Sequence, residues 1–290
     1  MTYTSTLRWS LLVALPLVVA LGCASSETTS PAPAEVSSGS EATDVANLTL
    51  DAIIASDYRS DRNKARDQYR HPVETLTFLG VEPDMRVLEI RPGTGWYTEI
   101  LALYLKNEGQ LTVGIPAPDG PRAKYRDRFL ALKAERPDVL GQVDFVTFEP
   151  PAPIDLGEDG SADMVLTFRN THNWITDGGE QEAYAAFFKV LRPGGTLGVV
   201  QHRATSTADP NKSAKNGYVP EPYVIKVAMD AGFEFVGGSD INSNPKDTRD
   251  HPAGVWTLPP VLRLGDEDRA KYEAIGESDR MTLKFRKPAK

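Results

Sequence analysis

The chain has 290 residues, of which 25% are charged and 40% hydrophobic, and a formal net charge of −8 at pH 7. This length and composition are those of an ordinary globular protein with one large domain or two small ones. A nucleic-acid surface needs a basic face, so the acidic balance predicts no nucleic-acid partner.

Residues 1–22 have the composition of an export signal. Arg8 precedes an apolar run, residues 11–21, that is shorter than the ~20 residues needed to span a bilayer. The only cysteine follows in Ala20-Leu21-Gly22-Cys23. This string resembles the lipobox of bacterial lipoproteins, whose cysteine becomes the lipidated N-terminus. We therefore expect a signal peptide over residues 1–22 and an exported lipoprotein, anchored through Cys23 at the periplasmic face of the cell envelope. A plain secretory signal is the alternative.

Residues 23–47 are rich in Ser, Thr, Ala, Pro and Glu and contain few large apolar side chains. Such a segment cannot bury enough apolar surface to offset its chain entropy, so we expect a flexible tether. The globular domain then covers residues 48–290. Because the chain has a single thiol, this domain cannot contain an internal disulfide.

Residues 48–79 are predicted to be helical in pieces. The middle part, residues 56–70, is strongly charged, and residues 72–79 form a short amphipathic helix that ends at Gly80. Charge at this density is typical of a solvated helix face. The basic side chains of this part are therefore left out of the predicted site: Arg62, Arg66, Arg70 and His71.

A buried strand, a glycine turn and a helix are predicted over residues 86–105. The apolar run at residues 87–90 is typical of a strand that is buried on both faces. The turn is Pro92-Gly93-Thr94-Gly95, and Trp96, Ile100 and Tyr104 then recur at helical spacing. Glycines permit a sharp turn and close approach to a ligand, which the free N–H groups of the new helix would face.

Strands and helices alternate through the rest of the chain, which favours an α/β fold with a mostly parallel sheet. Further strands are predicted at residues 110–115, 143–148, 163–168, 196–201, 233–236 and 281–285. The intervening helices are predicted at residues 121–135, 184–191 and 218–232. A long insertion, residues 240–279, separates the last two strands, and Trp256 and Leu258 suggest that it packs.

Two motifs in this frame resemble those of the class I methyltransferases that use S-adenosylmethionine (SAM). The first is an acidic residue followed by Gly-x-Gly, here Glu89, Gly93 and Gly95, with Arg91 in place of an earlier glycine. The second is Val190-Leu-Arg-Pro-Gly-Gly-Thr-Leu197, which resembles the segment before the fifth strand. The chain is most similar to exported bacterial proteins known only as predicted methyltransferases.

The resemblance covers residues 79–286 and implies a Rossmann-like sandwich, a mostly parallel seven-stranded sheet with helices on both faces. Residues 48–79 would form an N-terminal helical lid. The resemblance also implies SAM as the cofactor. The implied cofactor-binding residues follow three successive strands: Glu89, Arg91, Gly93, Thr94 and Gly95 in the first turn, then Glu149, and finally Arg169 and Asn170.

One position departs from the family pattern. An acid that binds the ribose hydroxyls should follow about 20 residues after the glycines. Ile115-Pro116-Ala117-Pro118 stands there instead. This departure counts against ordinary ribose recognition.

The segment Arg169-Asn-Thr-His-Asn-Trp174 is predicted to be a loop at the carboxyl end of a buried strand, where ligands of open α/β sheets lie. His172 and His202 are the natural proton acceptors there, because an unperturbed imidazole titrates near neutral pH. Asn173 could orient a substrate, which completes the predicted catalytic set. The spacing of His172, His202 and His251 matches no metal-ligand pattern, so no metal is expected.

The sequence therefore predicts a SAM-dependent methyltransferase that acts on a small molecule or an envelope component of unknown identity. The alternative is a non-catalytic binding protein that retains the methyltransferase fold. Two observations favour this alternative, the missing acid at Pro116 and an exported location in which no supply of SAM is expected. The oligomeric state does not follow from the sequence.

Overall fold

The computed structural model describes residues 48–290. The predicted signal peptide, the tether and Cys23 lie outside the described residues. Within residues 48–290, none of the helices has both the length and the apolar character required to cross a bilayer.

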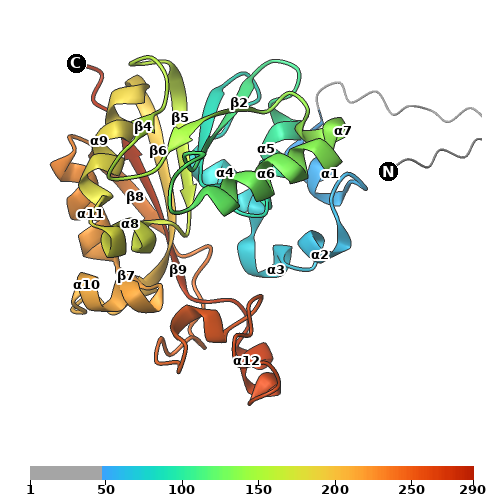
Figure 1. Ribbon diagram of the computed structural model, residues 1–290, viewed down its shortest axis with the longest axis vertical. Coiled ribbons are helices and arrows are strands. Elements are labelled where there is room, and N and C mark those ends of the chain that lie inside the picture. Colours follow the sequence, from blue (N-terminus) through green and yellow to red (C-terminus); the bar gives the residue numbers. More distant parts are fainter. Residues whose placement is uncertain (1–47) are drawn as a thin grey trace, which may run out of the picture. The chain divides into compact units, whose positions relative to one another are not determined.

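A nine-stranded sheet forms the centre of the described chain (Figure 1). Its order is β4-β3-β2-β1-β5-β6-β9-β8, and β7 pairs with β6. The strands are β1 (Arg86–Ile90), β2 (Gln110–Ile115), β3 (Asp144–Phe148), β4 (Ile154–Asp155), β5 (Ala162–Phe168), β6 (Leu191–Ala204), β7 (Val219–Pro220), β8 (Glu234–Ser239) and β9 (Arg280–Arg286). All seven predicted strands are present, so the expected seven-stranded sheet is confirmed, and the two-residue strands β4 and β7 are additions.

The sheet is parallel from β3 through β6, while β9 runs antiparallel between β6 and β8. Because β1 continues on one side into β2 and β3 and on the other side neighbours β5, the strand order reverses between β1 and β5. The carboxyl ends of these two strands therefore frame the position at which open α/β sheets bind ligands.

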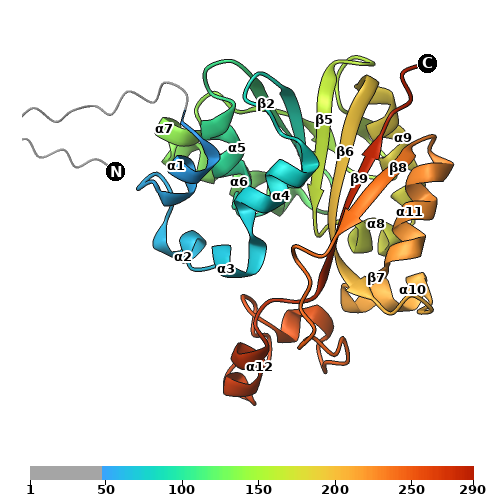
Figure 2. The same cartoon turned by 180° about the vertical axis from the view of Figure 1, so that it is seen from behind.

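Helices cover both faces of the sheet (Figure 2). They are α1 (Leu50–Ala55), α2 (Asp61–Lys64), α3 (Asp67–Arg70), α4 (Pro72–Leu79), α5 (Thr98–Tyr104), α6 (Ala123–Glu135), α7 (Pro137–Leu140), α8 (Thr171–Asp177), α9 (Glu180–Val190), α10 (Pro210–Ser213), α11 (Glu221–Asp230) and α12 (Arg269–Ile275), with the 3₁₀ turns η1 (Ala214–Asn216) and η2 (Gly254–Thr257). Successive residues of a strand point to opposite faces, so Val87 and Leu88 belong to two different core clusters.

The charged segment before β1 is not the solvated face that its composition predicts. Arg59 and Arg70 are only 2% and 1% exposed, and their guanidinium carbons lie 5.2 and 4.7 Å from the ring centroid of Trp96. Arg59 also forms ion pairs with Asp67 at 2.7 Å and with Glu99 at 2.9 Å. Arg59 and Arg70 therefore anchor the segment to Trp96 and α5, whereas Arg62 is exposed as predicted.

The insertion between β8 and β9 is folded onto the domain. The side-chain amide of Asn242 donates to the hydroxyl oxygens of Thr75 and Thr282, each at 2.9 Å. Asp247 is 1% exposed and accepts a hydrogen bond from the Tyr218 hydroxyl at 3.0 Å. These contacts bring the end of the insertion to the carboxyl ends of the central strands.

Candidate functional site

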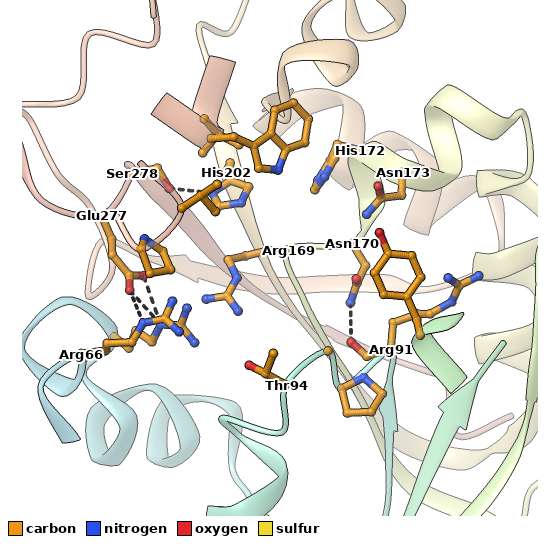
Figure 3. Close-up of a pocket in the computed structure, with 18 of the residues that line it drawn as sticks. Arg66, Arg91, Thr94, Arg169, Asn170, His172, Asn173, His202, Glu277 and Ser278 are labelled. Carbon is orange, nitrogen blue, oxygen red and sulfur yellow. Dashed lines mark hydrogen bonds and ion pairs between the residues drawn. The ribbon is translucent and has the colours of Figure 1, made fainter. Parts of the chain in front are cut away.

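A cavity of about 530 Å³ opens above the carboxyl ends of the central strands (Figure 3). This is the size range of small-molecule sites. Its walls come from the segment before β1, the turns after β1, β2, β5 and β6, and the insertion. The lining side chains discussed below are Arg66, Arg70, Arg91, Gly93, Thr94, Ile115, Pro116, Arg122, Tyr125, Phe129, Arg169, Asn170, His172, Asn173, His202, Trp256, Arg263, Glu277 and Ser278.

The two glycines of the first turn have different roles. Gly93 has φ +63°, and a Cβ there would meet nothing within 4 Å. Gly95 has φ +77°, but a Cβ there would lie 2.8 Å from Cδ2 of Leu132 on α6. Gly93 therefore keeps the cavity open beside Thr94, whereas Gly95 permits close packing and does not line the cavity.

Glu89 lies at the end of β1, beneath the turn and away from the cavity wall. It is 2% exposed, and the hydroxyl of Thr98 donates to its carboxylate at 2.6 Å. Burial raises the pKa of Glu89 to about 7, although the Thr98 hydrogen bond opposes the shift. Glu89, which was predicted to bind the cofactor, therefore accepts a hydrogen bond from the start of α5 and does not line the cavity.

Glu149 is also absent from the cavity wall. Its Oε1 accepts a hydrogen bond from Nη2 of Arg91 at 3.0 Å and lies 3.9 Å from Nη1 of Arg122. Burial lowers the pKa of Arg91, and the charge of Glu149 opposes that shift. The carboxylate that was predicted to bind the cofactor therefore compensates the charge of Arg91, and Arg91 and Arg122 face the cavity in its place.

The end of β2 gives the cavity an apolar side. Ile115 and Phe129 are each 1% exposed and line the cavity together with Pro116 and Tyr125. No carboxylate occupies the position after β2, as the sequence predicts from Pro116. This side can cover a flat heterocycle, but it contains no carboxylate to accept hydrogen bonds from sugar hydroxyls.

Arg169 and Asn170 follow β5 at the centre of the cavity (Figure 3). The amide nitrogen of Asn170 donates to the carbonyl oxygen of Ile90 at 2.9 Å and thereby joins the ends of β5 and β1. The guanidinium of Arg169 points into the cavity, and none of residues 48–290 accepts a hydrogen bond from it. Burial and the nearby arginines lower the pKa of Arg169 to about 10, despite the attraction of Glu277.

His172 lies on helix α8, so the prediction that residues 169–174 form a loop is wrong beyond Asn170. Its Nδ1 lies 3.2 Å from the amide nitrogen and 3.5 Å from the amide oxygen of Gln201, so the direction of this hydrogen bond depends on the tautomer of the ring. Burial lowers the pKa of His172 to about 4. Asn173, on the same helix, lines the cavity beside it (Figure 3).

The ring of His202 lies 5.8 Å from that of His172, and its Nδ1 is 2.5 Å from the hydroxyl oxygen of Ser278. Burial lowers its pKa well below 6.5, and the charges of His172 and Arg169 add to this shift. Both imidazoles are therefore neutral near pH 7. The expectation that they titrate near neutral pH is wrong, because burial disfavours the charged form of each ring.

Several cavity residues were missed by the sequence reasoning. Arg66 and Arg70 had been assigned to a solvated face, and the insertion contributes Trp256, Glu277 and Ser278. The regular spacing of the basic residues before β1 is the one local signal that pointed to a shared face. In the described part of the chain, no group of three or more His, Cys, Asp or Glu residues is arranged to hold a metal ion.

Neither a protein-family model nor a curated protein matches the sequence. Solved structures do match the fold. The [4+2]-cyclase SpnF has a TM-score of 0.55 and 17% identity, over 81% of this chain and 86% of the other. The glycopeptide N-methyltransferase MtfA, solved with S-adenosyl-L-homocysteine (SAH), has a TM-score of 0.50 and 14% identity, over 77% and 90% of the two chains. The chain has the Rossmann-like fold of the class I methyltransferases.

Proposed function

We propose that this protein binds SAM in the cavity above β1 and β5 and is a SAM-dependent methyltransferase. The observation that carries the proposal is the open turn at Gly93, placed where the strand order reverses and faced by an apolar wall. The structural similarity to MtfA, which was solved in complex with SAH, supports the same choice of ligand.

The residues of the cavity fit this ligand in part. Ile115, Phe129 and Tyr125 would cover the adenine, and the backbone of Gly93 and Thr94 would lie against the rest of the nucleoside. Because Pro116 stands in place of the acid, the ribose hydroxyls would form their hydrogen bonds with water. When bound, SAM supplies an electrophilic methyl group on a sulfonium centre.

The chain's own contribution to such a reaction is alignment of the acceptor and control of its proton. Asn173 and His172 both offer hydrogen-bonding groups on the cavity wall. His202 is neutral and linked to Ser278, so it can accept a proton, although its lowered pKa makes it a weak base. This set favours an acceptor that needs orientation more than strong deprotonation.

The test is calorimetric titration of the full chain with SAM and with SAH. We expect a binding heat and a saturable isotherm with both ligands. Absence of heat with both, in a sample whose circular dichroism shows a folded protein, would rule out the proposal.

The second candidate is a non-catalytic binding protein. Its supporting observation is that Glu89 and Glu149 do not line the cavity and that Pro116 replaces the ribose acid. The similarity to the [4+2]-cyclase SpnF also shows that this fold is not restricted to methyl transfer. A protein that binds SAH but forms none from SAM with any acceptor supplied would favour this candidate.

We further propose that the chain is exported and attached to the cell envelope through a lipid on Cys23, as its first 23 residues predict. Mass spectrometry of the mature N-terminus and fractionation of a Cys23→Ser variant test this. Lipidation predicts a modified Cys23 and release of the variant from membranes. An unmodified wild-type cysteine would contradict it.

A further inference from the structure

Four arginines surround one carboxylate at the side of the cavity formed by the N-terminal segment and the insertion. We call Arg66, Arg70, Arg169 and Arg280 the arginine cluster. Three of its members contact Glu277: Arg66 Nε at 2.7 Å, Arg70 Nε at 3.1 Å and Arg280 Nη1 at 3.1 Å. The fourth, Arg169, points into the same space without a hydrogen-bond partner in the described chain (Figure 3).

The charges of this group do not balance. Four guanidinium groups act on the single carboxylate of Glu277, and Arg169 also acts on Glu89, whose pKa is about 7, so positive charge remains in excess. Arg70, Arg280 and Glu277 are 1%, 3% and 4% exposed, so water does little to compensate the excess. Burial without an opposite charge is strongly unfavourable for an ion, and charged groups in this position normally have a partner.

Two hydrogen-bond donors of the cluster also lack an acceptor. Nη1 of Arg70 and Nε of Arg280 are buried and have no partner. Burial would raise the pKa of Glu277, yet the surrounding arginines lower it to about 2. Glu277 is therefore ionised near neutral pH. An additional acceptor with negative charge would satisfy Arg70 and Arg169 together, since both line the cavity.

We propose that the arginine cluster binds a multiply charged oxyanion, a phosphoryl group or a dicarboxylate, that belongs to the methyl acceptor. The assignment to the acceptor rests on the proposed function. SAM itself cannot balance the cluster, because its single carboxylate is outweighed by its ammonium and sulfonium groups and the molecule is a cation. Planar guanidinium groups bind phosphate and carboxylate through paired hydrogen bonds, which suits this class of ligand.

The cluster also predicts that the two ligands bind cooperatively. A cationic cofactor placed beside this excess of positive charge is repelled, and a bound anion removes that repulsion. Anion binding should therefore increase the affinity for SAM, and SAM should increase the affinity for the anion by the same factor.

The experiment is titration of the full chain with inorganic phosphate and with malonate, at ionic strength held constant with sodium chloride, followed by calorimetry and thermal unfolding. The test variant is Arg169→Gln, because the side chain of Arg169 forms no hydrogen bond within residues 48–290 that the substitution would break. The matched control is Arg263→Gln, which removes an arginine of the same cavity outside the cluster. Acetate is the monovalent control.

We expect saturable binding of phosphate or malonate but not of acetate. Binding should be weakened at least tenfold in Arg169→Gln and unchanged in Arg263→Gln. Divalent anions that stabilise the protein no more than chloride, or an Arg169→Gln variant that binds them like the wild type, would overturn the inference.

The same samples distinguish failure of this inference from failure of the proposed function. Titration with SAM in the presence and absence of phosphate should give a higher affinity with phosphate. Phosphate binding without any SAM binding would leave an anion site but reject the methyltransferase assignment. SAM binding without phosphate binding would reject only the anion site.

Discussion

Arg91 and Glu149 form a buried ion pair, with Nη2 and Oε1 3.0 Å apart, that links the first turn to the end of β3. Arg91 has φ +55°, a left-handed conformation that favours glycine. The family glycine is replaced by Arg91, and Glu149 is absent from the cavity wall. The two departures are linked, because the Glu149 carboxylate is the ion-pair partner of the Arg91 guanidinium. This pair sets the cavity apart from the one that the resemblance implies.

The first prediction concerns this pair. Glu149→Gln leaves the charge of Arg91 without its main partner, so we expect the free energy of unfolding to fall by roughly 2–4 kcal/mol. Urea unfolding measures the loss. The control is Glu158→Gln, which neutralises an exposed carboxylate and should change stability by less than about 0.5 kcal/mol. Equal effects of the two variants would contradict the role of the pair.

The second prediction concerns Gly93. Gly93→Ala places a methyl group in the open space of the turn, so we expect SAH affinity to fall by at least roughly tenfold, about 1.4 kcal/mol. Gly178→Ala is the matched control, because Gly178 has φ +69° and equally open surroundings but does not line the cavity. Both variants carry the same backbone strain. Equal SAH affinity in the two would show that the turn makes no contact with the ligand.

The third prediction is a gain of affinity. Pro116→Asp supplies the carboxylate that is missing after β2, and a hydrogen bond to a charged group contributes about 1.5–3 kcal/mol. We therefore expect SAH to bind roughly tenfold more tightly. Pro118→Asp adds the same charge at an exposed position outside the cavity and should leave the affinity unchanged. If a folded Pro116→Asp variant binds SAH no better than the control, the nucleoside lies elsewhere.

The fourth prediction concerns pH. The pKa of His172 is about 4 in the folded protein because of burial, against 6.5 for an unperturbed histidine. Below pH 6.5 the unfolded state binds more protons, so the stability that neutral His172 contributes is present above pH 6.5 and is lost as the pH falls toward 4. From pH 7 to pH 5 the expected loss is about 2 kcal/mol.

The variant His172→Gln should remove that part of the acid destabilisation. Burial shifts the pKa of His202 in the same direction, so some loss remains. Urea unfolding at pH 7 and pH 5 provides the comparison. A variant that loses as much stability as the wild type would show that His172 does not titrate as its burial predicts.

The fold could be predicted because the strands are apolar runs bounded by Gly, Pro and charged residues. β1, β5 and β6 lie where the pattern places them, whereas β4 and β7 have only two residues each and leave no periodic signal. Residues at the carboxyl ends of adjacent strands meet in space, which is why Asn170 and His202 were brought to one cavity.

The arginine cluster could not be predicted, because the burial of its members depends on contacts across most of the chain. Arg66 and Arg70 lie 211 and 207 positions from their partner Glu277. A high local density of charge usually marks a solvated helix face. It contains no information about the carboxylate of Glu277, which lies more than 200 positions away in the sequence. The helix at His172 was missed for a different reason, since Thr, His and Asn give little helical signal.

A crystal structure of the full chain grown with saturating SAH tests the central claim most directly. The account predicts electron density for the adenine against Ile115 and Phe129, with the rest of the nucleoside along the turn at Gly93. A cavity that shows no such density at saturating SAH, or SAH bound at another surface, would contradict it.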